Sequence, residues 1–275
     1  MTAPTTTHRT DGAASVRAAF DAARAEGRAA LVVYLTAGYP DLSTSRACYE
    51  AAVEAGADVL EVGIPFSDPM MDGPTIQIAN QHVLEAGTTV SQQLEMVAGL
   101  DVEVPRLAMT YVTIADTRGY ERFAREVADA GLSGVILPDL PVAEAGPWLD
   151  AARPAGLATV FLAASVSTDE RLDAIAAAST GFVYATGLLG VTGVKDVAQD
   201  EARALVERLR ARTGTPIAVG IGVKDRASAA AVASYADGVI VGSSVVARAG
   251  DGDPAGAPER VAALVRELRA GVADR

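Results

Sequence analysis

A glycine turn runs directly into a short apolar segment in Ala55-Gly56-Ala57-Asp58-Val59-Leu60-Glu61-Val62-Gly63. The same phrase returns at residues 130–137, which read AGLSGVIL, and at residues 236–242, which read ADGVIVG. Each copy is typical of a helix end that is followed by a buried strand. Because one pattern recurs along the chain, the sequence indicates a fold assembled from repeated helix and strand units.

Other apolar runs of similar length supply the remaining strands. They lie at residues 31–35, 104–109, 158–162, 182–185 and 216–219. With the three repeated phrases they make roughly eight strands, separated by amphipathic stretches that are long enough for crossover helices. This alternation predicts an α/β fold, a single (β/α)8 TIM barrel with extra N-terminal and loop helices. A doubly wound open sheet is the alternative.

Domain organisation follows from the same pattern. The chain has no Pro- or Ser-rich linker, so we expect one barrel domain at residues 13–275. The polar, Thr-rich residues 1–12 are expected to form a disordered tail.

Composition and charge restrict the function. The chain has 275 residues, of which 50% are hydrophobic and 21% charged, so it can bury a large core. Its 35 acidic and 23 basic residues give a formal net charge of −12. The chain therefore lacks the basic surplus that binding to nucleic acid or to an anionic membrane requires. No apolar run approaches about 18 residues and no signal sequence is evident, so we expect a soluble cytoplasmic protein.

Residues that could bind a metal are scarce. Cys48 is the single cysteine, which excludes an internal disulfide and a thiolate cluster. The two histidines, His8 and His82, have no partner at metal-ligand spacing. The sequence predicts no metal site.

Glu61 is the first candidate for chemistry. It is a lone carboxylate within the apolar run 59–62, where an unpaired charge is costly to bury. In a parallel barrel, reactive side chains lie at the carboxyl ends of the strands. Two interpretations stay open: a catalytic carboxylate, or a structural ion pair or strand end that reaches solvent.

The segment after this strand, residues 63–77, has the composition of a shaped loop over a pocket. It contains three prolines, two glycines and two carboxylates, more than an ordinary turn would need. Asp72 is its second carboxylate. Asp72 either contributes to a site or only caps the helix that begins near Thr75.

Glycine-rich segments follow three later strands. Residues 219–223 and 241–244 could bring backbone N–H groups close together around a phosphate. Residues 187–193 have the glycine content of a hinged lid. Each segment could also be a plain turn, but together they favour a phosphate site at the carboxyl ends of the last strands.

On these motifs the sequence resembles the α subunit of tryptophan synthase. The matching stretches are residues 60–69, 72–77, 138–141, 190–193, 220–222 and 242–243, in the order of the family, over roughly residues 13–248. The resemblance implies a carbon–carbon lyase of amino-acid biosynthesis, which cleaves indole-3-glycerol phosphate into indole and glyceraldehyde 3-phosphate in a retro-aldol reaction.

The resemblance also implies roles for individual residues. Glu61 would be the general acid and base, Asp72 would accept a hydrogen bond from the indole N–H, and Tyr184 would lie near Glu61. Thr192 would be the lid residue that meets Asp72 on closure. The phosphate would contact Gly193, Gly220, Ile221, Gly222, Gly242 and Ser243. The indole pocket would consist of Tyr34, Met109, Tyr111, Ile136 and Leu162, although the apolar members fit a barrel core equally well.

A partner follows from the same resemblance. The family implies an α-β-β-α heterotetramer with a β subunit that carries pyridoxal phosphate, and no cofactor in this chain. The lid segment Gly187-Leu188-Leu189 and the pair Met70-Met71 depart from the family pattern, in the lid and in the loop that meets the β subunit. The alternatives are a stand-alone lyase of a secondary pathway, a weakly active barrel that serves as an allosteric partner, and another phosphate-binding barrel.

Overall fold

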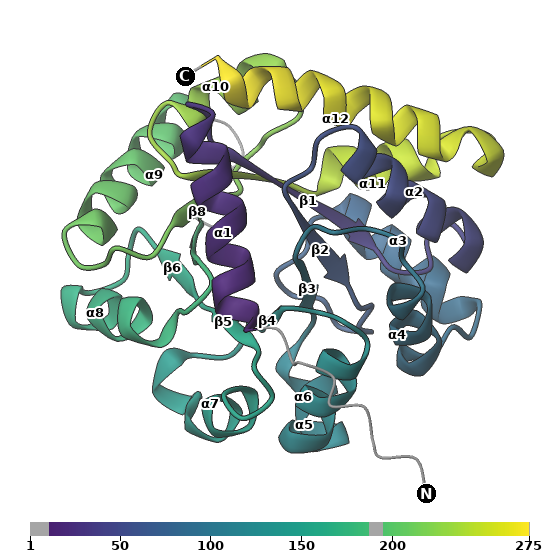
Figure 1. Ribbon diagram of the computed structural model, residues 1–275, viewed down its shortest axis with the longest axis horizontal. Coiled ribbons are helices and arrows are strands. Elements are labelled where there is room, and N and C mark those ends of the chain that lie inside the picture. Colours follow the sequence, from purple (N-terminus) through teal and green to yellow (C-terminus); the bar gives the residue numbers. More distant parts are fainter. Residues whose placement is uncertain (1–10, 187–194, 275) are drawn as a thin grey trace, which may run out of the picture.

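The computed structural model describes residues 11–186 and 195–274, which fold into a parallel β-barrel surrounded by helices (Figure 1). The strands are β1 (Ala30–Thr36), β2 (Val59–Gly63), β3 (Arg106–Met109), β4 (Gly134–Ile136), β5 (Ala158–Val160), β6 (Leu162–Ala164), β7 (Val183–Thr186), β8 (Ile217–Val219) and β9 (Gly238–Val241). The helices are α1 (Gly12–Ala25), α2 (Leu42–Glu54), α3 (Pro74–Glu85), α4 (Val90–Ala98), α5 (Val112–Arg118), α6 (Tyr120–Asp129), α7 (Gly146–Ala152), α8 (Asp169–Ala178), α9 (Lys195–Arg210), α10 (Arg226–Ala233), α11 (Ser243–Gly250) and α12 (Ala257–Ala273), with 3-10 turns at Val142–Glu144 and Pro254–Gly256.

The sheet closes on itself through a divided strand. Its order is β5-β4-β3-β2-β1-β9-β8-β7-β6, and all neighbouring strands are parallel. The two ends of this order, β5 and β6, are consecutive in the chain and are separated only by Phe161, whose carbonyl accepts the N–H of Tyr184 at 3.1 Å. The predicted strand 158–162 thus pairs with β4 through its first half and with β7 through its second. The predicted (β/α)8 barrel is confirmed, with nine assigned strands because one is divided.

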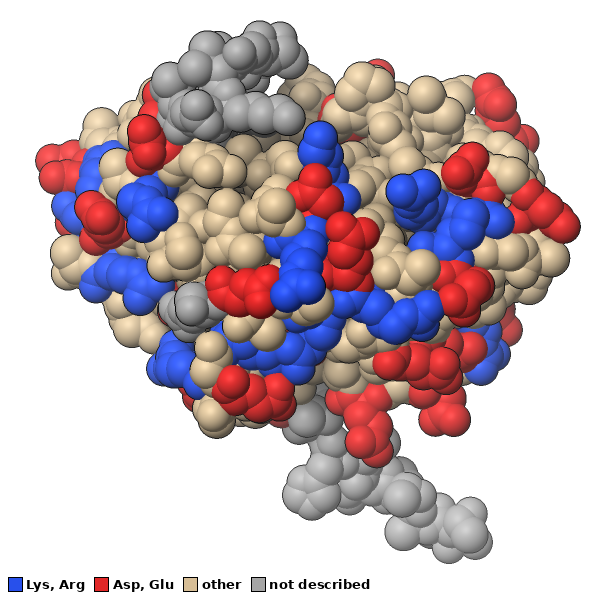
Figure 2. All heavy atoms as spheres, turned by 90° about the horizontal axis from the view of Figure 1, so that it is seen from above, with Lys and Arg blue, Asp and Glu red and all other residues tan. Residues whose placement is uncertain are grey.

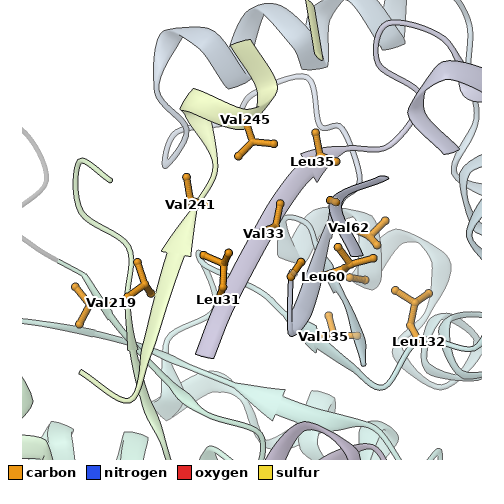
Figure 3. Close-up of a cluster of buried hydrophobic side chains, with 14 of the residues drawn as sticks. Leu31, Val33, Leu35, Leu60, Val62, Leu132, Val135, Val219, Val241 and Val245 are labelled. Atoms are coloured by element: carbon orange, nitrogen blue, oxygen red, sulfur yellow. The ribbon is translucent and has the colours of Figure 1, made fainter. Parts of the chain in front are cut away.

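Side chains alternate between two apolar layers, as the period of a strand requires. Val32 of β1, Leu107 of β3 and Ile240 of β9 belong to the cluster inside the barrel. Leu31, Val33 and other alternate residues belong to the layer between the strands and the helices. Figure 3 shows this outer layer, in which the side chains along β1 lie close to those of β9 and α11. The repeated apolar runs of the sequence are buried on both faces for this reason.

Helix α1 closes the amino-terminal end of the barrel and runs across it in Figure 1. Its Val16 and Phe20 join the inner cluster, and the Phe20 ring lies 5.6 Å from that of Phe182. The helix begins at Gly12, one residue before the predicted start of the barrel, and the side chain of Asp11 caps it. A Cβ at residue 12 would overlap the carbonyl of Ser133, so this close approach requires glycine. A site inside this barrel must therefore open at the carboxyl ends of the strands.

Charges of both signs are mixed on the face shown in Figure 2. Ion pairs such as Arg226–Asp274 and Arg269–Glu26 bring opposite charges together around α12. Within the described residues, no helix combines the length and the apolar character needed to cross a bilayer.

Candidate active site

A cavity of about 210 Å³ opens at the carboxyl ends of the strands. Strand ends and the loops after β2, β8 and β9 supply its walls. The described lining residues are Tyr34, Glu61, Met71, Asp72, Gly73, Ile76, Met109, Tyr184, Gly220, Gly222, Val223, Ile240, Gly242 and Ser243. A larger hollow of about 460 Å³ surrounds Arg106 at the start of β3. That hollow lies at the opposite end of the barrel, away from the end where barrel enzymes hold their reactive groups.

Glu61 occupies the middle of β2, in register with Tyr34 of β1 and Leu107 of β3. The residue is 1% exposed, and its Oε1 has no hydrogen-bond partner among the described residues. Burial raises the pKa of Glu61 from 4.5 to about 8. The carboxyl group can thus hold a proton at neutral pH and still release it, which is what a combined acid and base requires. This burial excludes the interpretation of a strand end that reaches solvent.

The raised pKa of Glu61 makes stability depend on pH. Between the unfolded value of 4.5 and the folded value of about 8, only the folded state retains the proton. The free energy of unfolding contributed by Glu61 is therefore fully present below pH 4.5 and falls as the pH rises through this window. Glutamine does not titrate, so Glu61→Gln should not lose stability as the pH rises. Between pH 5 and 9 we expect the free energy of unfolding of the variant to gain on that of the native chain by on the order of 2–4 kcal/mol, at about 1.4 kcal/mol per pKa unit.

Urea denaturation of both proteins across this pH range measures the difference. Any cost of burying the glutamine amide is the same at every pH, so the pH dependence of the difference is the informative quantity. Two unfolding free energies that run parallel from pH 5 to 9 would show that Glu61 titrates normally.

Asp72 reaches the cavity from the loop between β2 and α3. The pKa of its carboxyl group is raised to about 6, mainly by burial, while hydrogen bonds with Tyr111 and Asn80 act in the opposite direction. The Nδ2 of Asn80 lies 3.2 Å from Asp72 Oδ2. The alternative that Asp72 only caps the next helix is wrong, because Gly73 is the N-cap of α3 and no side chain caps that end.

The end of the cavity where the sequence predicts a phosphate consists largely of backbone. Gly242 is the N-cap of α11 and Ser243 is its first residue, so N–H groups of this first turn have no acceptor within the helix. Gly222 has a φ of +59°, a conformation that favours glycine, and the space above its Cα is open. The Ser244 hydroxyl donates to the carbonyl of Val223 at 3.1 Å and ties the two loops together. Such converging amides at a helix N-terminus suit an anion.

Tyr34, Met109 and Tyr184 line the cavity as the resemblance implies, whereas other predicted pocket residues do not. Ile136 is fully buried in the inner layer of the barrel, and Leu162 packs against that layer. Both positions fit the barrel-core interpretation that the sequence left open.

Two further predicted contacts lie outside the described lining. Tyr111 stands behind the loop, where its hydroxyl accepts the N–H of Met71 at 2.9 Å and its ring stacks on Phe66 at 5.2 Å. Ile221 packs against the outer apolar layer. The remaining predictions, Thr192, Gly193 and the segment Gly187-Leu188-Leu189, lie outside the described residues.

Sequence reasoning missed several lining residues. Ile76 and Val223 lie within the predicted segments 63–77 and 219–223 but were not named as site residues, and Ile240 points inward from β9. The period of two along residues 238–242 could have placed Ile240 and Gly242 on one face, because alternate residues share a side of a strand. Asn80 gave no sequence signal, since its contact with Asp72 depends on the path of the loop.

Fold and site together define a (β/α)8 barrel with two carboxyl groups and a set of backbone amides at a helix N-terminus around one cavity, an arrangement typical of barrel enzymes that act on phosphorylated substrates. The barrel places the carboxylates and the glycine-rich loops on strand ends that are far apart in the sequence. The chain belongs to the tryptophan synthase alpha chain family, whose model matches residues 20–273.

Relatives and solved structures agree with this assignment. The tryptophan synthase alpha chain of Streptomyces coelicolor is 48% identical over 254 residues, which cover 91% of this chain and 94% of the relative. The alpha chain of Mycobacterium tuberculosis is 46% identical, with 92% of each chain covered.

Among solved structures, the aminoacrylate-bound form of M. tuberculosis tryptophan synthase is similar with a TM-score of 0.85 and 43% identity, over 94% of this chain and 99% of that one. The alpha subunit from Legionella pneumophila has a TM-score of 0.85 at 31% identity, over 95% and 99% of the two chains.

Proposed function

We propose that this protein cleaves indole-3-glycerol phosphate into indole and glyceraldehyde 3-phosphate as the α subunit of a tryptophan synthase. One observation carries the proposal. The buried carboxyl group of Glu61, the carboxyl group of Asp72 and the backbone amides at Gly242 and Ser243 line a single cavity. These are the three contacts that the reacting atoms, the indole N–H and the phosphate of this substrate need.

The protonated Glu61 begins the reaction by giving its proton to C3 of the indole. This converts the ring into an indoleninium, and Asp72 stabilises the positive charge by accepting the ring N–H. The resulting Glu61 carboxylate then takes the proton of the glycerol hydroxyl next to the scissile bond. The oxygen electrons form the aldehyde, and the electrons of the carbon–carbon bond return to the ring. Glu61 ends protonated, so one group serves as both acid and base.

Tyr184 contributes a neutral phenol beside this carboxyl group. Burial raises the pKa of Tyr184 well above its ordinary value, and the charge of Glu61 adds to the effect. A Cβ at Gly220 would come within 2.6 Å of the Tyr184 hydroxyl, so glycine is what leaves room for the phenol. We assign Tyr184 to the site as a donor that stays protonated during turnover.

A β subunit is the proposed partner, in an α-β-β-α assembly. Apolar side chains are exposed on the loop after β2 and on α3, with Met70 81% and Ile78 66% accessible. A hollow of about 530 Å³ between Phe66 and α3 lies beside them. Exposed apolar groups at one place favour a protein interface. Pyridoxal phosphate belongs to the β partner in this proposal, and the chain itself needs no cofactor for the cleavage.

The test is release of indole from indole-3-glycerol phosphate by the purified chain, with and without a β subunit from the same source. Slow release that the β subunit accelerates supports the two-subunit synthase. Fast release of indole at a rate that the β subunit does not change means a stand-alone lyase. Binding of the β subunit without any cleavage means an allosteric barrel, and failure to bind an indole-propanol phosphate analogue means another phosphate-binding barrel.

A further inference from the structure

Asn80 is a buried polar residue in the interior of α3, and it contacts the carboxyl group of Asp72. It is 3% exposed, and its Nδ2 lies 3.2 Å from Asp72 Oδ2. Its Oδ1 has no hydrogen-bond partner among the described residues. Asn80 does not line the cavity, whereas Asp72 does. Among the described residues, Asn80 is therefore linked to the cavity through Asp72.

A second side chain of α3 also forms a hydrogen bond with Asp72. Gln77, one turn before Asn80, donates its Nε2 to the backbone carbonyl of Asp72 at 2.8 Å. Residues three apart lie on one face of a helix, so a single face of α3 fixes both the backbone and the carboxyl group of Asp72. From the opposite side, the hydroxyl of Tyr111 accepts the N–H of Met71 at 2.9 Å.

Stability alone does not explain asparagine at this position. Asparagine is a weak helix former, and an amide oxygen that is buried without a donor is unfavourable. An apolar residue or alanine would avoid both costs. Polar groups that violate local rules in this way are concentrated at functional sites.

We propose that Asn80 is a positioning residue, which aims the ionised carboxylate of Asp72 at the cavity before substrate enters, while Gln77 fixes the backbone beneath it. The inference rests on the proposed function, because it assigns to Asp72 the role of accepting the indole N–H. In this proposal Asn80 does not touch the substrate. It favours the ionised form of Asp72, the residue that does.

The surroundings of Asp72 explain why a donor is needed. Tyr34, Tyr111 and Tyr184 face it as neutral phenols, and Glu61 is the other carboxyl group of the cavity. Burial favours the neutral form of Asp72, and the hydrogen bonds from Tyr111 and Asn80 oppose it. Removing the Asn80 donor shifts this balance toward the protonated form, which cannot accept the indole N–H as strongly.

The experiment compares Asn80→Ala and Asn80→Asp with the native chain in complex with the β subunit. Asn80→Ala removes the donor, and Asn80→Asp also adds a second carboxyl group beside Asp72. We expect the kcat for indole release near pH 7 to fall about tenfold in Asn80→Ala and further in Asn80→Asp, while the KM changes less than about threefold. The acid limb of kcat/KM should move up by about one pH unit or more.

Gln93→Ala is the matched control. Gln93 is a buried amide of α4, 2% exposed, and its Oε1 also has no hydrogen-bond partner among the described residues. Its Nε2 donates to the carbonyl of Ala37 at 3.2 Å and not to Asp72, so its variant should keep the native pH profile. Thermal unfolding of each variant separates a folding defect from a functional one. Loss of turnover with an unshifted acid limb in both Asn80 variants, or native turnover in both, would overturn the proposal.

A second readout does not depend on activity. In protein labelled with 13C at the aspartate carboxyl groups, the signal that disappears in Asp72→Asn reports the titration of Asp72. We expect its midpoint to rise in Asn80→Ala and to stay unchanged in Gln93→Ala. If the native chain releases no indole but the midpoint still shifts, the proposed function fails while the positioning role stands. An unshifted midpoint refutes the positioning role alone.

Discussion

Replacing Glu61 by glutamine is expected to lower the rate of indole release by at least about two orders of magnitude, the range that general acid and base groups supply. Glutamine has nearly the same shape as glutamic acid but cannot give and take a proton. The Oε1 of Glu61 has no hydrogen-bond partner among the described residues, so the substitution breaks no hydrogen bond with them at that atom. The loss should therefore appear in kcat, with the fold retained.

Binding separates this chemical role from a structural one. Affinity for the inert analogue indole-propanol phosphate should change less than about threefold in Glu61→Gln, because the analogue uses the phosphate end and the apolar walls of the cavity. Circular dichroism checks that the variant is folded. A loss of analogue affinity as large as the loss of turnover would remove Glu61 from the acid and base role.

Replacing Ser243 by aspartate is expected to reduce kcat/KM for the phosphorylated substrate by about 100-fold or more. Two like charges about 4 Å apart repel by roughly 4 kcal/mol at the dielectric constant typical near a protein surface. The helix itself should tolerate the change, since Ser243 is the first residue of α11 and a negative charge is favourable at a helix N-terminus. The effect should therefore fall on binding of the phosphate and leave folding intact.

Ser243→Ala is the control for the loss of the hydroxyl, and we expect it to cost less than about tenfold, the value of one hydrogen bond. Indole-propanol without its phosphate group should bind the native chain and the aspartate variant equally. Similar mild losses in the alanine and aspartate variants would place the phosphate elsewhere than at α11.

The barrel could be predicted from the sequence because its signals are local. Each strand is a short apolar run, three of the runs follow the same glycine turn, and eight alternating units leave few ways to pack a parallel sheet. The division of one strand at Phe161 could not be predicted, because it depends on which neighbour pairs with each half of residues 158–164.

The candidate site could be predicted in part for the same reason. Glu61 stands out as a charge within an apolar run, and family motifs mark Asp72 and Ser243. The surroundings of Asp72 could not be read from the sequence, since Asn80 and Tyr111 approach it from a helix and from the end of another strand. The sequence also could not show how deep Ile136 and Leu162 lie, because apolar residues fill most inward positions of a barrel, in the core and at the pocket alike.

Val16 and Phe20 of α1 close the amino-terminal end of the barrel, so in the described part of the chain the cavity is reached from the carboxyl ends of the strands. Substrate entry and product release therefore both take place on that side of the barrel. A protein bound over that end of the barrel can control substrate entry and product release together. Such a protein can regulate turnover without any contact with Glu61 or Asp72.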